Sequence, residues 1–143
     1  MHIHLPPDFW VIVAIILGGV FLVVLFSFAE AQATGGWGSF AKRYPAPTRP
    51  AGEAYSVLSW RICNVYDPGR CLRVIFTDTG IYFYMTFFRR LAHPPFLVPW
   101  ESVKRVESSR RFYVLEIEDA AGGFRLELPR SVEYDLSRYQ KAA

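Results

Sequence analysis

Histidine and cysteine side chains are the first candidates for chemistry in this chain of 143 residues. His2 and His4 stand at its start, His93 precedes two prolines, and Cys63 and Cys71 are the two cysteines. A zinc site needs three or four ligands, which neither the two tail histidines nor the two cysteines supply. A nucleophilic site needs a base that an acid orients, and no such set surrounds His93. The sequence therefore predicts neither a catalytic residue nor a bound metal.

Acidic residues and glycines point the same way. Glu116, Glu118 and Glu127 fall in strand-like segments, where we expect a solvated edge rather than an acid–base pair. The glycine-rich segment 35–38 follows an apolar helix rather than a β-strand, so it lacks the context of a phosphate-binding loop. We expect no cofactor, no small-molecule substrate and no enzymatic activity.

Residues 9–28 form the strongest signal in the chain, because they carry no charge and Ser27 is their one polar side chain. A helix of about 20 residues is about 30 Å long, which matches the hydrocarbon core of a bilayer. We expect 9–33 to be a transmembrane helix with a short extension. A cleaved signal peptide is one alternative, since residues 31–33 read Ala-Gln-Ala, and a buried core helix is another. The length of the run and the absence of Lys and Arg before it favour the uncleaved anchor.

Positive charge indicates the orientation of this helix. No Lys or Arg precedes the run, whereas Lys42, Arg43 and Arg49 follow it. By the positive-inside rule, the tail 1–8 lies outside the cell and the C-terminal part lies in the cytoplasm. We expect a protein that crosses the inner (plasma) membrane once.

Aromatic and basic residues mix in the segment after the helix. Trp37, Phe40 and Tyr44 have the spacing of one helix face, and Lys42 and Arg43 point elsewhere. Two interpretations stay open. Either these five residues form a membrane interface, with rings in the headgroup region and cations on phosphates, or the rings pack on the core of the following domain.

A proline-rich spacer and a β domain follow. Residues 45–50 contain three prolines, so we expect the juxtamembrane segment 34–54 to hold the domain a short distance from the bilayer. Residues 55–143 show period-two patterning, which predicts short strands. The expected elements are a hairpin of Val57–Tyr66 and Cys71–Phe76 around the turn Asp67–Arg70, a turn at Thr77–Gly80, the strand Ile81–Met85, and an edge or bulged strand Phe96–Trp100 that Val103–Glu107 extends.

The two cysteines lie on opposite strands of that hairpin. Its register places Tyr66 opposite Cys71 and Cys63 opposite Val74. The sulfurs then belong to different cross-strand pairs, so no disulfide forms. We expect two small buried side chains, and free thiols fit a reducing compartment.

The last two strands have the clearest register. Phe112–Glu118 and Phe124–Leu128 flank a glycine-containing turn. One face then carries the pairs Ile117 with Phe124, Leu115 with Leu126, and Tyr113 with Leu128, and the wet face sets Glu116 opposite Arg125. After them, Ser131 caps a helix to about Lys141, with an apolar stripe of Val132, Leu136 and Tyr139.

Together these elements predict one N-terminal transmembrane helix plus a mainly-β domain, a small antiparallel barrel or sandwich with a C-terminal capping helix. A strand, the segment Thr77-Asp78-Thr79-Gly80-Ile81-Tyr82, a basic loop and Val98-Pro99-Trp100-Glu101-Ser102-Val103 follow in an order that resembles bacterial PH-like and GRAM-like domains. The resemblance covers roughly residues 55–141. It implies two near-orthogonal antiparallel sheets capped by a helix, and binding rather than catalysis. The junction 37–44 also resembles small single-pass bacterial membrane proteins.

Basic doublets carry the remaining signal. Residues 37–143 contain all 16 Lys and Arg and 11 of the 13 Asp and Glu, which leaves a net charge of +5. Arg89-Arg90, Lys104-Arg105 and Arg110-Arg111 fall in or beside predicted loops. Loops gathered at one end of a barrel would present them together to anionic lipid, and ordinary solubilising charge is the alternative. The segment Phe87-Phe88-Arg89-Arg90-Leu91 predicts a lipid- or partner-binding loop, or else a strand end with buried rings.

These features predict a non-enzymatic membrane protein that presents a PH-like interaction module at the cytoplasmic surface. Its expected partners are membrane lipids and other integral membrane subunits of a larger complex, in which it is an accessory or scaffold. Gly18-Gly19 allows close approach of another helix. The alternative function is a peripheral sensor of anionic lipid. Nucleic acid is not an expected partner. An OB-like barrel that binds nucleic acid needs aromatic side chains on an open face, where the bases stack, and the membrane anchor disfavours this role.

Overall fold

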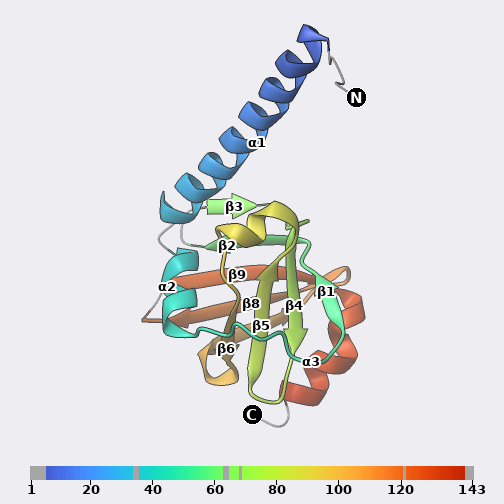
Figure 1. Ribbon diagram of the computed structural model, residues 1–143. Helices are drawn as coiled ribbons and strands as arrows, with labels where there is room; N and C mark the ends of the chain where they lie inside the picture. The colour runs from blue at the N-terminus through green and yellow to red at the C-terminus, as the bar shows by residue number, and fades with distance from the viewer. Residues whose placement is uncertain (1–5, 34–35, 63–64, 68, 121, 141–143) are drawn as a thin grey trace.

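A computed structural model describes residues 6–33, 36–62, 65–67, 69–120 and 122–140. The chain begins with the long helix α1 (Pro7–Ala33) and the short helix α2 (Gly36–Arg43), and it ends with α3 (Glu133–Gln140) (Figure 1). The strands between them are β1 (Ala54–Ser56), β2 (Ser59–Ile62), β3 (Val65–Asp67), β4 (Leu72–Phe76), β5 (Gly80–Met85), β6 (Phe96–Pro99), β7 (Val103–Ser108), β8 (Phe112–Asp119) and β9 (Gly122–Pro129). Three 3-10 turns join some of them: η1 (Phe87–Leu91), η2 (Trp100–Ser102) and η3 (Arg130–Val132).

Helix α1 projects away from the rest of the molecule (Figure 1). Its segment Asp8–Ser27 has a mean hydropathy of 3.0, and Ser27 at its end is its one buried residue. An apolar helix with exposed sides all round is long enough to cross a bilayer, although a signal sequence has the same properties.

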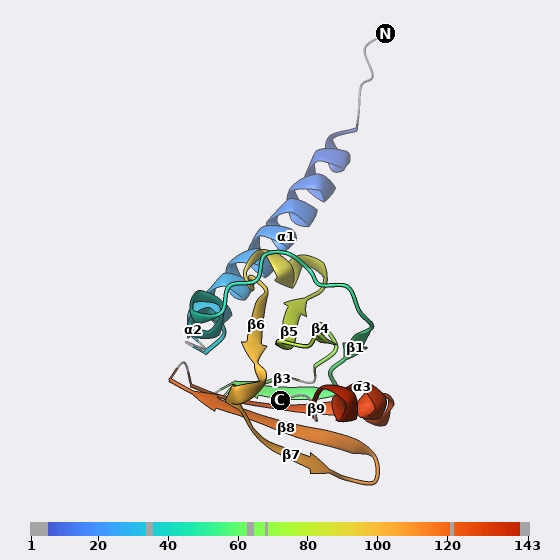
Figure 2. The ribbon, with the colours of Figure 1, turned by 90° about the horizontal axis from the view of Figure 1, so that it is seen from below.

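Two antiparallel sheets form the body of the domain. One has the strand order β1-β4-β5-β6 and the other has the order β3-β2-β9-β8-β7. The sheets lie as separate layers, with α2 at one side and α3 at the other (Figure 2). The core between them is rich in fully buried side chains, among them Phe83, Phe96 and Phe124. The predicted mainly-β domain with a C-terminal helix is confirmed at this level.

The predicted register of the last two strands is confirmed. Strand β8 pairs with β9 so that Ile117 faces Phe124, Leu115 faces Leu126, and Tyr113 faces Leu128. All six side chains are buried, whereas Arg125 reaches Glu116 on the other face at 3.3 Å. A short turn between two alternating segments leaves one register that buries every apolar residue.

The predicted hairpin around Asp67 is wrong. Strand β4 pairs with β1 and β5, so Val74 lies opposite Tyr55 and Phe83. The chain changes sheets at Val57 and Leu58: the amide of Val57 donates to Leu72 in one sheet, and that of Leu58 donates to Glu127 in the other. Cys63 lies outside the described residues, and Cys71 is a free thiol.

Strand β7 is not the predicted extension of β6. The turn η2 separates the two strands, and β7 pairs with β8 in the five-stranded sheet. Strand β6 lies at the edge of the four-stranded sheet, as Pro99 predicts, since proline cannot donate to a ladder. The edge-strand prediction is therefore confirmed and the continuation is not.

The C-terminal helix covers the open side between β1 and β9 (Figure 2). Val132 and Leu136 are buried and Tyr139 packs against the same core, which confirms the predicted stripe. Ser131 lies within η3 and not at the start of α3, so its predicted capping role is wrong, and Lys141 lies outside the described residues. The hydroxyl of Tyr55 donates to the Asp135 carboxylate of α3 at 3.1 Å.

The folded domain begins at α2 rather than at Tyr55. Trp37 and Phe40 are 1% and 0% exposed and belong to the main core. After α2, the chain runs along the edge of β6, where the amide of Leu97 donates to Tyr44 and that of Ala46 donates to Pro95. The proline-rich segment 45–50 therefore lies beyond the first core element of the domain, and it does not separate the domain from α1.

Candidate functional site

Trp37 and Phe40 are core residues, and their predicted role in a membrane interface is wrong. The Trp37 ring lies 4.7 Å from the ring of Phe96, and its indole donates to the carbonyl oxygen of Pro94 at 3.0 Å. The Phe40 ring packs between those of Phe96 and Phe124, at 5.7 and 6.1 Å. The second interpretation, packing on the domain's own core, is confirmed because α2 covers the open side between the two sheets.

The other three residues of the predicted interface lie at the end of α2. Lys42 and Arg43 are exposed, and Tyr44 is partly buried. The Tyr44 hydroxyl donates to the Asp119 carboxylate, and Arg43 Nε lies 3.3 Å from the same group. The hydrogen bond and charge of Tyr44, and then Asp119, raise the pKa of Arg43. These contacts connect α2 with the β8–β9 turn. Lys42 is exposed, and among the described residues it has neither a hydrogen bond nor an ion pair.

The segment Phe87–Leu91 is the 3-10 turn η1, so the interpretation as a strand end is wrong. Arg89 is bound to Asp67, with the guanidinium and carboxylate 2.5 Å apart. Arg90 is exposed, and Leu91 is 70% exposed. The side chains of Phe87 and Phe88 lie outside the described ones. Arg90 and Leu91 are therefore the two side chains of this segment that the structure describes as exposed and that a partner could contact.

The basic doublets do not gather at one end of the domain. Arg89 and Arg90 lie in η1, which contacts α1. Lys104 and Arg105 lie on β7, the far edge of the five-stranded sheet, and Arg105 pairs with Glu107 of its own strand. Arg110 and Arg111 form the exposed β7–β8 turn, which lies on the side of α3, away from α2 (Figure 2). One shared lipid surface for all three doublets is therefore wrong.

His93 is a buried structural residue. It is 3% exposed, its ring meets that of Trp37 edge-on at 5.4 Å, and its Nδ1 donates to the carbonyl oxygen of Arg89 at 2.9 Å. The histidine thereby joins η1 to α2 and has no open path to a substrate. In the described part of the chain, no three His, Cys, Asp or Glu residues cluster as a metal site would require.

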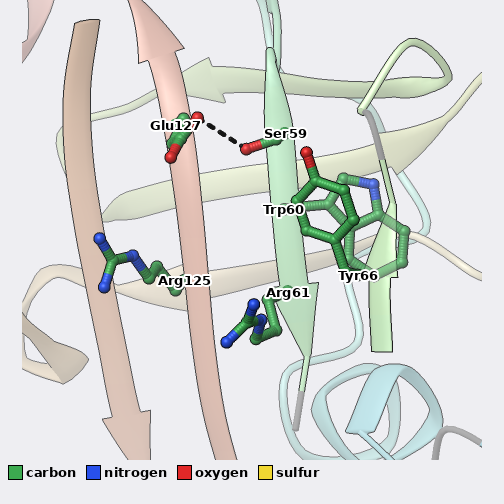
Figure 3. A pocket seen from close by; sticks show the side chains of 6 residues that line it. All are labelled: Ser59, Trp60, Arg61, Tyr66, Arg125 and Glu127. Carbon is green, nitrogen blue, oxygen red and sulfur yellow. Dashed lines mark hydrogen bonds between the residues drawn. The ribbon is translucent and has the colours of Figure 1, made fainter. Parts of the chain in front are cut away.

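A groove on the outer face of the five-stranded sheet is a feature that the sequence analysis missed. It has a volume of about 270 Å³. Its lining residues are Ser59, Trp60, Arg61, Tyr66, Arg125 and Glu127. One end holds Arg61 and Arg125, and at the other end Ser59 donates to Glu127 at 2.8 Å (Figure 3).

Pairing across three strands creates the charge of this groove. Arg61 of β2 lies directly opposite Arg125 of β9 on one side and opposite Tyr66 of β3 on the other. Arg125 has the Glu116 carboxylate as a partner, but among the described residues no carboxylate lies within ion-pair distance of Arg61. Like charges directly opposite each other destabilise a sheet. An anion bound between the two guanidinium groups would relieve this repulsion, because arginine binds phosphate and carboxylate oxygens.

The groove begins at the end of the domain from which α1 departs. Strand β3 and the turn η1 both lie at this end (Figure 1). Helix α1 contacts η1 and α2, and Ser27 is 6% exposed although Phe26 beside it is 74% exposed. The last turns of α1 are therefore docked on the domain.

Comparison of the chain with protein-family models, with curated proteins and with solved structures gives no significant match. The resemblance to PH-like and GRAM-like domains thus stays a prediction. The function of the chain is therefore inferred from its own geometry.

Proposed function

We propose that this chain is a non-enzymatic, single-pass membrane protein. In this proposal α1 spans the inner membrane, and the β domain is a PH-like interaction module held directly at the cytoplasmic surface. The protein is an accessory or scaffold subunit of a larger membrane complex.

The connection between α1 and the core is the observation that carries this proposal. Two residues separate Ala33 at the end of α1 from Gly36 at the start of α2. The three Cα–Cα steps from Ala33 to Gly36 span at most about 11 Å, and Trp37, directly after Gly36, is already in the domain core. A domain connected in this way stays against the surface of whatever holds α1. A cleavable leader has no need of such docking, which supports an uncleaved anchor.

Charge supports the cytoplasmic orientation. Every Lys and Arg of the chain follows α1, and Lys42 is exposed a few residues beyond its end. The positive-inside rule places such residues in the cytoplasm.

Open space beside Gly18 and Gly19 of α1 supports the proposal that other membrane helices bind there. No heavy atom lies within 4 Å of a side chain added at Gly18 or Gly19, so another helix has open access to this turn. Small residues at such a point let two helices approach closely within a bilayer. Other integral membrane subunits are therefore the proposed partners.

Extraction from native membranes tests the proposal. The full-length chain should stay in the membrane pellet at alkaline pH and should carry its intact N-terminus. After extraction in mild detergent, it should co-purify with partners in stoichiometric amounts. The double variant Gly18→Leu, Gly19→Leu should lose these partners, whereas the control Ile16→Leu on the same turn should keep them.

Two results would contradict this function. A freely soluble chain that begins near residue 34 would show that α1 is a cleaved leader. A clean monomer recovered from native membranes would refute the role as a subunit. Labelling of a cysteine added after Ala143 only from the cytoplasmic side is the result expected for the proposed orientation.

A further inference from the structure

The end of the domain beside α1 carries cations and apolar side chains that the described residues leave uncovered. Tyr66 of β3 is 62% exposed, and Leu91 of η1 is 70% exposed. Three arginines are also exposed: Arg61 in β2, Arg70 just before β4, and Arg90 in η1. We call these five residues the helix-side surface. We propose that the helix-side surface binds the phosphate groups of anionic lipids, an inference that rests on the proposed membrane anchoring of α1.

The depth of this surface follows from the docking of α1. The apolar segment Asp8–Ser27 contains 20 residues, which match the hydrocarbon thickness of about 30 Å. Ser27 is both the last residue of that segment and buried, and α1 contacts η1. The turn η1 therefore lies at the level where the hydrocarbon ends and the headgroups begin.

The residue types match that level of a bilayer. An exposed leucine beside an exposed arginine places an apolar side chain at the acyl boundary and a cation at the phosphates, as in interfacial segments. Tyrosine is enriched at the same depth, because its ring is apolar and its hydroxyl is polar. Leu91 and Arg90 supply the first pair from η1, and Tyr66 supplies the ring from β3.

The net charge of the surface is positive. The carboxylate of Asp67 is bound to Arg89 at 2.5 Å and accepts the amide of Gly69 at 2.9 Å, so it does not compensate the other arginines. Among the described residues, no carboxylate lies within ion-pair distance of Arg61, Arg70 or Arg90.

The groove extends the same chemistry away from the bilayer. Neighbouring strands lie about 4.8 Å apart, so Arg61 stands one strand and Arg125 two strands from Tyr66 at the sheet edge. A lipid headgroup that passes Tyr66 reaches Arg61 first, where no carboxylate competes among the described residues. Phosphate is the ligand chemistry, and a lipid is its source because the edge of the groove faces the membrane.

Lipid co-purification with the full chain tests the proposal. The protein is reconstituted in phosphatidylcholine vesicles with a minor fraction of phosphatidylglycerol and is re-extracted in mild detergent. The phosphatidylglycerol that stays bound is measured by mass spectrometry relative to its input fraction. The test variant replaces Arg61, Arg70 and Arg90 with Gln. The control replaces Lys104, Arg110 and Arg111 with Gln, which removes the same charge from exposed positions away from α1.

We expect wild type and control to retain phosphatidylglycerol. In the test variant, the enrichment of phosphatidylglycerol over its input fraction should fall at least about fivefold. Fivefold corresponds to about 1 kcal/mol, the contribution of one cation near an anionic surface. Equal loss in both variants would overturn the proposal, since net charge alone would then explain binding. No enrichment in wild type would also overturn it. If the triple variant does not fold, Arg90→Gln with Arg90→Lys as rescue gives the same comparison.

Two further experiments distinguish lipid from other ligands, and failure of this inference from failure of the proposed function. Inorganic phosphate that raises the unfolding temperature in pure phosphatidylcholine, with no effect of phosphatidylglycerol, would assign the surface to a soluble anion and refute the lipid. An acidic protein co-purified from native membranes in place of lipid would refute it equally. A chain absent from the alkaline membrane pellet would contradict the anchoring itself, whereas an anchored chain without lipid preference contradicts this inference alone.

Discussion

Truncation of Phe40 tests whether α2 belongs to the domain or to the membrane surface. Phe40→Ala removes a fully buried ring that contacts Phe96 and Phe124. A buried Phe→Ala change costs about 3–5 kcal/mol, because apolar contacts are lost and a cavity is left. For a domain of about 100 residues, each kcal/mol lowers the melting temperature by about 4 °C, so we expect a loss of about 12–20 °C.

The assay is thermal unfolding of the full chain in detergent micelles, followed by near-ultraviolet circular dichroism. This signal reports the packed aromatic core and is insensitive to a helix that stays folded in the micelle. Lys42→Ala is the matched control, since it lies on the same helix and is exposed. A surface change of this kind stays within about 0.5 kcal/mol, or about 2 °C.

Equal melting temperatures for Phe40→Ala and Lys42→Ala would refute the reasoning. That outcome would mean that the ring contributes nothing to the core, and the membrane-interface interpretation would return. A loss in Phe40→Ala that lies well above the control, with no change in membrane association, is the result that the packing requires.

Three other changes probe separate contacts. Asp67→Ala removes the carboxylate that binds Arg89, and we expect a loss of about 1–3 kcal/mol in chemical denaturation, so an unchanged midpoint would contradict the ion pair. Burial, and then bonds to two carboxylates, raises the pKa of Tyr55. The unfolded chain therefore loses this proton first, stability falls as pH rises above about 10, and Tyr55→Phe should flatten that fall in a pH series of melting temperatures. Gly80→Ala sets a methyl group against the backbone of β6 and should cost about 1–3 kcal/mol, whereas Gly123→Ala, with open space around it, should change stability little.

Local patterns succeeded where neighbours in the chain are also neighbours in space. The β8–β9 register could be predicted because a short turn joins two alternating segments and a shift by one residue would expose every apolar side chain. The same alternation failed at Val57 and Leu58. A strand that changes sheets keeps its period of two, so the pattern does not reveal which partner each half takes.

The junction after α1 shows a second kind of ambiguity. Trp37 and Phe40 form one apolar helix face, and such a face fits a bilayer boundary as well as a protein core. The choice depends on the uncovered side between the two sheets, which α2 fills. No local feature of the helix reports that opening.

The candidate site depended on long-range pairing throughout. Arg61 and Arg125 become direct neighbours only because β2 pairs with β9, and Tyr66 joins them through β3. Arg110 and Arg111 form a doublet much like that of Arg89 and Arg90, yet the fold sets it apart from α1.

By itself, the sequence determined one long apolar helix, a mainly-β domain and the final hairpin, because composition and alternation over adjacent residues are enough for these. Only the tertiary structure decided where the domain begins, which sheet each short strand joins, and which cations lie on the elements beside α1. Those features depend on contacts between segments far apart in the chain, and their energy comes from covering the surfaces that other elements leave open.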